Sequence, residues 1–98
     1  MLYVIYALDA PEVAALRAAS RPAHLERVRA LNEQGRLVLV GPMPRIDAPS
    51  LEAGVTGSLI VAEFDSLEIA RDWMAHDPYV KAGVYASIDV RPFFRVNP

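Results

Sequence analysis

The sequence predicts an α+β domain whose elements follow the order β-α-β-β-α-β. Four segments rich in aliphatic and aromatic residues have the length of strands, at positions 2–8, 36–42, 57–64 and 84–94. Stretches with helical spacing of apolar residues follow the first and the third of them. The chain has 98 residues, so we expect one compact domain over residues 1–98.

The first strand, LYVIYAL at 2–8, is apolar without interruption, which is typical of a buried strand. DAPEV ends it, and Pro11 fits the first turn of a short alanine-rich helix. A second helical stretch begins near Pro22. It should end at Gly35, because glycine readily adopts the left-handed conformation that follows a helix.

The second strand, RLVLVGP at 36–42, leads into a loop from Met43 to Thr56 with two prolines and little periodicity. Ordered loops of this length are more often functional or contact-forming than idle. The third strand, GSLIVAEF at 57–64, precedes a helix that Asp65 or Ser66 can cap. One face of that helix carries its apolar side chains, Leu67, Ala70, Trp73 and Met74.

HDPYVKAG at 76–83 predicts a single helical turn, which Asp77 caps and Pro78 begins. The last strand, VYASIDVRPFF at 84–94, alternates in character, so one of its faces is wet. The wet set is Tyr85, Ser87, Asp89 and Arg91. The whole order is the split βαβ arrangement of ferredoxin-like folds, in which two helices cover one face of a four-stranded antiparallel sheet.

The first three strands are apolar on both faces, although both helices lie on one side of the sheet. The uncovered side would be an exposed apolar patch, which soluble monomers avoid. We therefore expect sheet-to-sheet pairing with a second copy, giving a homodimer or a higher oligomer.

Composition excludes several classes of function. The chain has no cysteine, which excludes disulfides, thiolate zinc sites and a thiol nucleophile. Net charge is −2, and the strand at 57–64 lacks the basic and interleaved aromatic residues of RNA-recognition modules, so we expect no nucleic-acid partner. No phosphate-binding glycine loop is present, so we expect no nucleotide cofactor. No leader or apolar run of roughly 20 residues occurs, and we expect a cytoplasmic protein without membrane contact.

The candidate chemistry centres on His24. On a helical wheel its side chain falls between Val28 and Leu31, the buried stripe, so the histidine should point inward at the end of the core. A place in the first turn of the helix at Pro22 would disfavour the imidazolium. A nearby carboxylate would orient the ring and fix its tautomer, as a general base requires. The alternative is a core histidine bonded to a backbone carbonyl.

Spacing alone does not choose the carboxylate. The candidates are Asp9, Glu63, Asp65, Asp77 and Asp89. Asp77 differs from the rest because it lies in a tight turn flanked by apolar residues, although it is equally suited to be a plain cap. A metal site made of His24, His76 and Asp77 lacks any ligand-spacing motif, so we expect none.

Six segments, taken in order, resemble the YciI-like (YCII-related) proteins nearly end to end: MLYVIYALD, RPAHLERV, GRLVLVGP, GSLIVAEF, DPYVKAGVY and VRPF. The resemblance implies a ferredoxin-like subunit that pairs through its sheets as a dimeric α+β barrel, in agreement with the packing argument. It also implies a histidine–aspartate dyad in a pocket. The histidine of RPxHL corresponds to His24 and the aspartate of DPY to Asp77.

Further site residues follow from the same resemblance. Ser58 matches as well, and its hydroxyl could bind substrate. Arg21 could pair with a substrate carboxylate, or it could be a solvated or helix-packing arginine. Tyr79 could wall the pocket or be a core tyrosine.

The resulting expectation is a small-molecule enzyme. His24, oriented by Asp77, would move a proton in a lyase, isomerase or dehydrohalogenase reaction, since at least one YciI-like relative is a dehydrochlorinase. A covalent mechanism at Ser58 is disfavoured because no G-x-S-x-G motif surrounds it. The alternative is a non-catalytic metabolite-binding or accessory homodimeric module.

Overall fold

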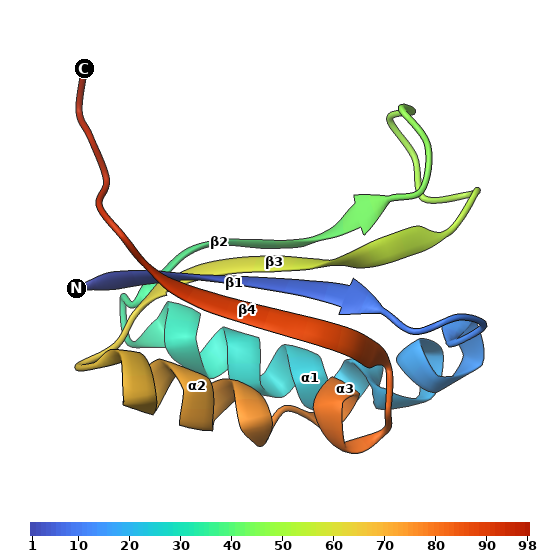
Figure 1. Cartoon of the computed structure of the whole chain (residues 1–98), viewed down its shortest axis with the longest axis horizontal. Coiled ribbons are helices and arrows are strands. Elements are labelled where there is room, and N and C mark those ends of the chain that lie inside the picture. The colour runs from blue at the N-terminus through green and yellow to red at the C-terminus, as the bar shows by residue number, and fades with distance from the viewer.

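A computed structural model describes every residue from Met1 to Pro98. The elements are β1 (Leu2–Asp9), α1 (Ala14–Glu33), β2 (Leu37–Pro44), β3 (Val55–Glu63), α2 (Leu67–Ala75), the short α3 (Pro78–Lys81) and β4 (Tyr85–Phe93). The strands form one sheet in the order β2-β3-β1-β4, with every neighbouring pair antiparallel. The helices lie together on one face of this sheet (Figure 1). The predicted ferredoxin-like fold is confirmed.

The core fills the layer between the sheet and the helices. Alternate side chains of β1 point into it, and Tyr3 and Ile5 lie opposite Ala62 and Ile60 of β3. Leu31 from α1 and Ala70 and Met74 from α2 close this layer from the other side. The apolar face predicted for α2 is therefore the face that it buries, and Ser66 caps the helix by accepting a hydrogen bond from the Ile69 N–H.

The main departure from the sequence prediction is α1, a single helix of 20 residues where we expected two. Pro22 lies inside it and cannot donate to the carbonyl of Ala18. Both residues are exposed, so water can replace this bond, while buried side chains hold the opposite face of the helix to the sheet. Helices in proteins depend more on such packing than on local propensity.

The continuous α1 also changes its two ends. The helix begins at Ala14, so Pro11 is in a turn and not in a helical turn as predicted. His24 lies in the middle of the helix, where the terminal dipole has little effect. The predicted stop holds, because Gly35 has a φ of 70° directly after the helix. No helix, α1 included, combines the length and the apolar character that a membrane span needs.

A β-bulge moves one aromatic side chain to the opposite face of the sheet. Leu8 pairs with Ser87, whereas the next residue, Asp9, pairs with Tyr85, so Ala86 is an extra residue in β4. Regular alternation placed Tyr85 on the wet face, and that prediction is wrong. The bulge turns Tyr85 toward the helices, where its hydroxyl reaches β3.

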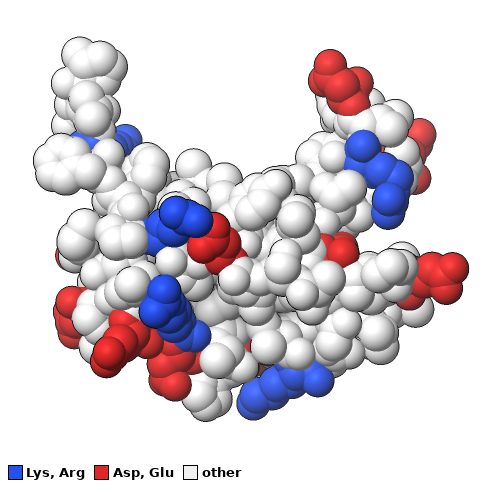
Figure 2. Space-filling view, in the orientation of Figure 1, with Lys and Arg blue, Asp and Glu red and all other residues white.

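The face of the sheet that the helices leave open is apolar. Tyr6 pairs with Leu59 across β1 and β3, and Leu39 of β2 extends the patch; Tyr6 and Leu39 are 44% and 48% exposed. The loop at 45–54 and the chain beyond Phe93 both project from this side (Figure 1). The surface between these projections is hollowed and mostly uncharged (Figure 2). The sheet thus has two apolar faces, as predicted.

Candidate functional site

His24 of α1 and Asp77, the residue before α3, lie against each other although 53 residues separate them. His24 Nδ1 is 3.1 Å from Oδ1 and 3.0 Å from Oδ2 of the carboxylate. Both side chains are buried, His24 at 5% exposure and Asp77 at 0%. A carboxylate can only accept, so it holds a hydrogen on Nδ1 and leaves the lone pair of a neutral imidazole on Nε2.

The Asp77 carboxylate is fixed by two further groups. Its Oδ1 accepts a hydrogen bond from the Tyr79 N–H at 2.9 Å, which is the predicted cap of α3. Arg27 Nη1 lies 3.4 Å from Oδ2, and Arg27 Nη2 donates to the Trp73 carbonyl at 2.8 Å. The cap and the histidine contact therefore coexist on one carboxylate, and the two interpretations of Asp77 do not compete.

A helical wheel of the same segment places Arg27 on the solvent side, but in the structure its side chain is half-buried. Its guanidinium lies 4.3 Å from the centre of the Trp73 ring, in cation–π geometry, while its nitrogens reach toward Asp77. A long arginine side chain can extend along apolar surface from a flanking position of a helix. Arg27 therefore reaches the Asp77 carboxylate although it lies outside the buried stripe of α1.

Tyr79 is both a core residue and a wall of the site. Its ring stacks on His24 with the centroids 4.2 Å apart and the planes 22° from parallel. It is 3% exposed and packs with Val13 and Val84. Burial raises the pKa of Tyr79, against the opposing charges of Arg17 and Arg21, so the phenol is neutral at physiological pH.

A cavity of about 480 Å³ opens beside His24. One wall is α1, with Arg17, Arg21 and His24, and the other comes from β2 and β3, with Ser58. His24 Nε2 has no hydrogen-bond partner in the protein. Every fully buried side-chain nitrogen or oxygen has such a partner, so Nε2 is not fully buried. The lone pair on Nε2 is thus available to a ligand in the cavity.

The structure brings the predicted site residues together. Arg21, His24, Ser58 and Tyr79 line the same cavity, and Asp77 lies behind His24. Arg21 is exposed and makes no hydrogen bond or ion pair with the protein, so its charge is free for a ligand.

A second polar network, which the sequence did not reveal, surrounds Ser58. Arg17 donates to both carboxylate oxygens of Asp9, at 2.7 and 2.9 Å, and its Nη2 also donates to Ser58 Oγ at 2.7 Å. The Tyr85 hydroxyl donates to the same Oγ at 2.9 Å. Asp9 was one of the candidate carboxylates, but Arg17 belonged to a segment predicted as a separate short helix, and Tyr85 was placed on the wrong face.

The ionisation states of this network are fixed by its surroundings. Burial lowers the pKa of Arg17, but the hydrogen bond and the charge of Asp9 outweigh burial and raise it above its usual value. Burial raises the pKa of Tyr85 to about 12, although the Ser58 hydrogen bond and the Arg17 charge act in the opposite direction. Arg17 is therefore a cation, and Tyr85 a neutral phenol, throughout the physiological range.

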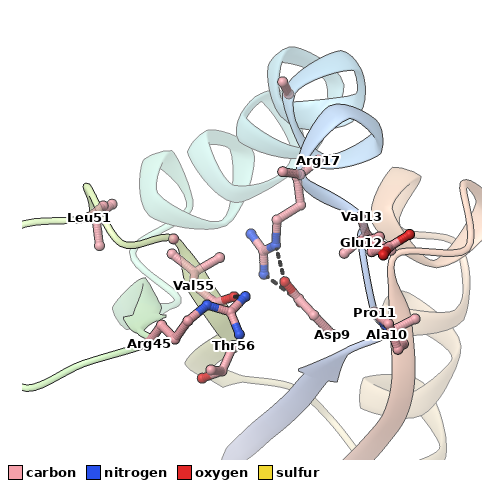
Figure 3. A pocket seen from close by; sticks show the side chains of 13 residues that line it. Asp9, Ala10, Pro11, Glu12, Val13, Arg17, Arg45, Leu51, Val55 and Thr56 are labelled. Atoms are coloured by element: carbon pink, nitrogen blue, oxygen red, sulfur yellow. Dashed lines mark hydrogen bonds and ion pairs between the residues drawn. The ribbon is translucent and has the colours of Figure 1, made fainter.

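A larger hollow of about 950 Å³ adjoins the first and shares Arg17, Ala18, Leu51 and Val55 with it. Arg45, Leu51, Val55 and Thr56 face the Arg17–Asp9 pair across this hollow (Figure 3). The loop predicted at 43–56 is shorter in the structure, from 45 to 54, because β2 and β3 extend into it. Leu51 and Gly54 of this loop line the larger hollow, while the loop as a whole projects from the open side of the sheet (Figure 1).

His76 directly precedes Asp77 in the chain, but its exposed side chain contacts none of these residues. Its Nδ1 lies 2.8 Å from the carbonyl oxygen of Asp72, which accepts a hydrogen bond from it on the protein surface. No three histidine, cysteine, aspartate or glutamate side chains are grouped as metal ligands would be.

Comparison with known proteins identifies the family of this chain. The family model described as the YCII-related domain matches residues 1–94. Protein YciI of Escherichia coli O6:H1 is 50% identical over 97 residues, which is 98% of this chain and 99% of that protein. An uncharacterized protein of Haemophilus influenzae is 50% identical over 98 residues, with 98% and 99% of the two chains covered.

A solved structure is similar over almost the whole chain. It is the 5-chloro-2-hydroxyhydroquinone dehydrochlorinase (TftG) from Burkholderia phenoliruptrix AC1100, in complex with 2,5-dihydroxybenzoquinone. The TM-score is 0.87 at 26% sequence identity, and the match covers 98% of this chain and 96% of that one. The resemblance inferred from the sequence motifs is confirmed, and the chain belongs to the YCII-related family.

Proposed function

We propose that the protein is a small-molecule enzyme in which His24, oriented by Asp77, removes a proton from a ligand in the 480 Å³ cavity. The observation that supports this most directly is the buried Nδ1–carboxylate contact, which leaves the unpartnered Nε2 accessible. The reaction class is a lyase, isomerase or dehydrohalogenase step that begins with proton abstraction.

The surroundings of His24 suit a base. When Nε2 accepts a proton, the imidazolium is stabilised by the adjacent Asp77 carboxylate, which Arg27 and the Tyr79 N–H hold in place. Stacking on Tyr79 fixes the plane of the ring. The base is therefore aimed before the ligand arrives, and little reorganisation is needed during the reaction.

The ligand that fits best is a small planar molecule that carries an anionic oxygen. The cavity volume lies within the range of about 300–1,000 Å³ that is usual for small-molecule sites. The unpaired Arg21 supplies positive charge, and Tyr79 a flat wall. TftG, a dehydrochlorinase of a chlorinated hydroxyhydroquinone, was solved with a dihydroxybenzoquinone, which supports a hydroxylated ring as the ligand here.

A substrate screen with paired variants tests the proposal. Small hydroxylated and halogenated aromatics and quinones would be assayed for isomerisation and for halide release. For any substrate found, we expect His24→Gln to lower kcat by about 10²- to 10⁴-fold, the usual contribution of a general base. His76→Gln, which changes the other histidine, is the matched control and should leave kcat unchanged.

The proposal fails if His24→Gln retains the activity of the unmodified protein. It also fails if ligands bind in the cavity and none is turned over, because the protein would then be a binding module. Melting temperatures of both variants show whether any loss of activity comes from unfolding.

We also infer a homodimer formed by the open faces of two sheets. A patch that includes Tyr6, Leu39 and Leu59 would otherwise face water, and the projecting loop and C-terminal segment border a hollow that a second subunit can fill. Light scattering should give twice the chain mass, and Leu39→Lys should lower it. A monomer mass for the unmodified protein at micromolar concentration would contradict the inference.

A further inference from the structure

The hydroxyl of Ser58 has only one hydrogen-bonding capacity left. A serine oxygen has two lone pairs and one hydrogen. One lone pair accepts from Arg17 Nη2 at 2.7 Å and the other from the Tyr85 hydroxyl at 2.9 Å. The donation from Arg17 cannot be reversed, because a guanidinium has no lone pair to offer. The Tyr85 hydroxyl does not line the cavity and has no acceptor in the protein other than Ser58, so its hydrogen belongs to that contact.

With Tyr85 as the donor in that contact, the hydrogen of Ser58 has no acceptor left within the protein. Ser58 lines the same cavity as His24. The position of its hydroxyl is well defined, because Arg17 is clamped through two hydrogen bonds by Asp9 and lies 4.9 Å from the centre of the Tyr79 ring. A hydroxyl that accepts from a cation is a strengthened donor, because hydrogen bonds in a chain polarise one another.

We propose that Ser58 is a dedicated hydrogen-bond donor to a ligand oxygen that is anionic or becomes anionic when His24 removes a proton. This inference rests on the proposed function and narrows its substrate class to carbonyl or quinoid compounds with an acidic C–H. Ser58 then acts as an oxyanion-binding group and not as a nucleophile. Arg17, Tyr85 and Asp9 act through it as positioning residues.

The chemical step is balanced without any other reactant. The Nε2 lone pair takes the proton of the C–H bond, and the electron pair of that bond forms a carbon–carbon double bond. The carbonyl π pair moves to oxygen, where the Ser58 hydroxyl binds the resulting enolate without giving up its own hydrogen. The enolate then expels a β-leaving group as an anion, which gives elimination, and the His24 imidazolium releases its proton to solvent. Where a second double bond extends the enolate, the imidazolium can instead return the proton at the γ-carbon, which gives isomerisation.

An oxyanion probe tests the role of Ser58 without knowledge of the substrate. The probe is 4-nitrophenol, whose absorption spectrum distinguishes the phenol from the phenolate, titrated at a pH just below its own pKa. We expect the protein to bind the phenolate preferentially. Ser58→Ala should weaken phenolate binding roughly 10- to 100-fold, the range for one hydrogen bond to a charged group. It should also shift the absorption spectrum of the bound probe toward that of the neutral phenol.

Two further variants keep the test informative. Ser87→Ala changes a serine on the opposite face of the sheet, away from the cavity, and should bind the phenolate as the unmodified protein does. Tyr85→Phe frees one lone pair of Ser58, so phenolate binding should fall by a smaller factor. If Ser58→Ala does not fold, the phenolate affinity of Tyr85→Phe decides whether the proposal holds. Unchanged phenolate binding and spectrum in the folded variant overturn the proposal.

The same titration separates this inference from the proposed function. In a His24→Gln background the base is absent, yet the phenolate should still bind in a manner that depends on Ser58. If phenolate binding depends on Ser58 but no turnover depends on His24, the proposed enzymatic function is refuted and the oxyanion site stands. Turnover that depends on His24, with phenolate binding indifferent to Ser58, would refute the oxyanion site alone.

Discussion

Replacing Asp77 by asparagine and by alanine separates its structural role from its chemical one. Alanine removes the cap of α3, worth about 1 kcal/mol, and leaves the buried Nδ1–H of His24 without an acceptor, which costs about 1–3 kcal/mol. The free energy of unfolding should therefore fall by about 2–4 kcal/mol. For a domain of this size that lowers the melting temperature by about 10–30 °C.

Asparagine keeps an oxygen where Oδ1 accepts from the Tyr79 N–H, so the cap survives. It loses the negative charge opposite Arg27, whose side chain is partly exposed, so we expect a loss of only about 1 kcal/mol. The amide can also turn an N–H toward Nδ1 of His24. That contact would place the imidazole hydrogen on Nε2 and remove the lone pair from the cavity.

Thermal unfolding by circular dichroism and nitrogen NMR of the imidazole measure the two roles separately. The unmodified protein should show an unprotonated Nε2, and Asp77→Asn a mixed or reversed tautomer with activity lowered about 10²-fold or more. Asp72→Ala, at an exposed aspartate, is the control and should melt as the unmodified protein does. If asparagine and alanine melt alike, or if asparagine keeps both the tautomer and the activity, the reasoning about this carboxylate is wrong.

Three other changes have predictable directions. Pro22→Ala restores the hydrogen bond to the Ala18 carbonyl, so the free energy of unfolding should rise by up to about 3 kcal/mol. Calorimetry should show a higher melting temperature, and a lower one would contradict the prediction. Gly57→Ala should abolish or severely reduce folding, seen as loss of soluble protein, because a Cβ there collides with the Ala7 carbonyl oxygen; a stable variant would show that the strands can separate. Burial raises the pKa of Tyr85 from 10.0 to about 12, so the unfolded state releases this proton first, and the free energy of unfolding should fall as pH rises between those values. Tyr85→Phe should lessen that alkaline loss in urea titrations, and an unchanged slope would contradict the assignment.

Sequence reasoning succeeded where the deciding physics is local. The period of a helix places His24 beside Val28 and Leu31, and those three side chains are the buried ones of α1. The Asp-Pro turn capped by Asp77 also follows from neighbouring residues. The contact between His24 and Asp77 does not, because it depends on the packing of α1 against α3, and only the family resemblance suggested it.

The failures share one physical cause, which is tolerance of a local defect by tertiary packing. Pro22 was expected to divide a helix that the sheet holds together, and this hid the fact that Arg17 and His24 lie on one continuous helix. The extra residue Ala86 reversed the face of Tyr85. A proline inside a helix and a bulge in a strand cannot be weighed without the surface they pack on, so the Ser58 network was invisible in the sequence.

Tyr79 explains how the two polar networks can serve one ligand. Its ring stacks on His24, lies beneath the Arg17 guanidinium and meets the Tyr85 ring edge-on, with the centroids of the two tyrosines 5.8 Å apart. Because Tyr79 is also a core residue, its position is set by the fold and not by the ligand. The Tyr79 ring therefore helps to fix His24 directly, and it helps to fix Ser58 through Arg17 and Tyr85. If the two proposed roles hold, the site would select ligands by the spacing between a removable hydrogen and an oxygen, and substrate screens should vary that spacing first.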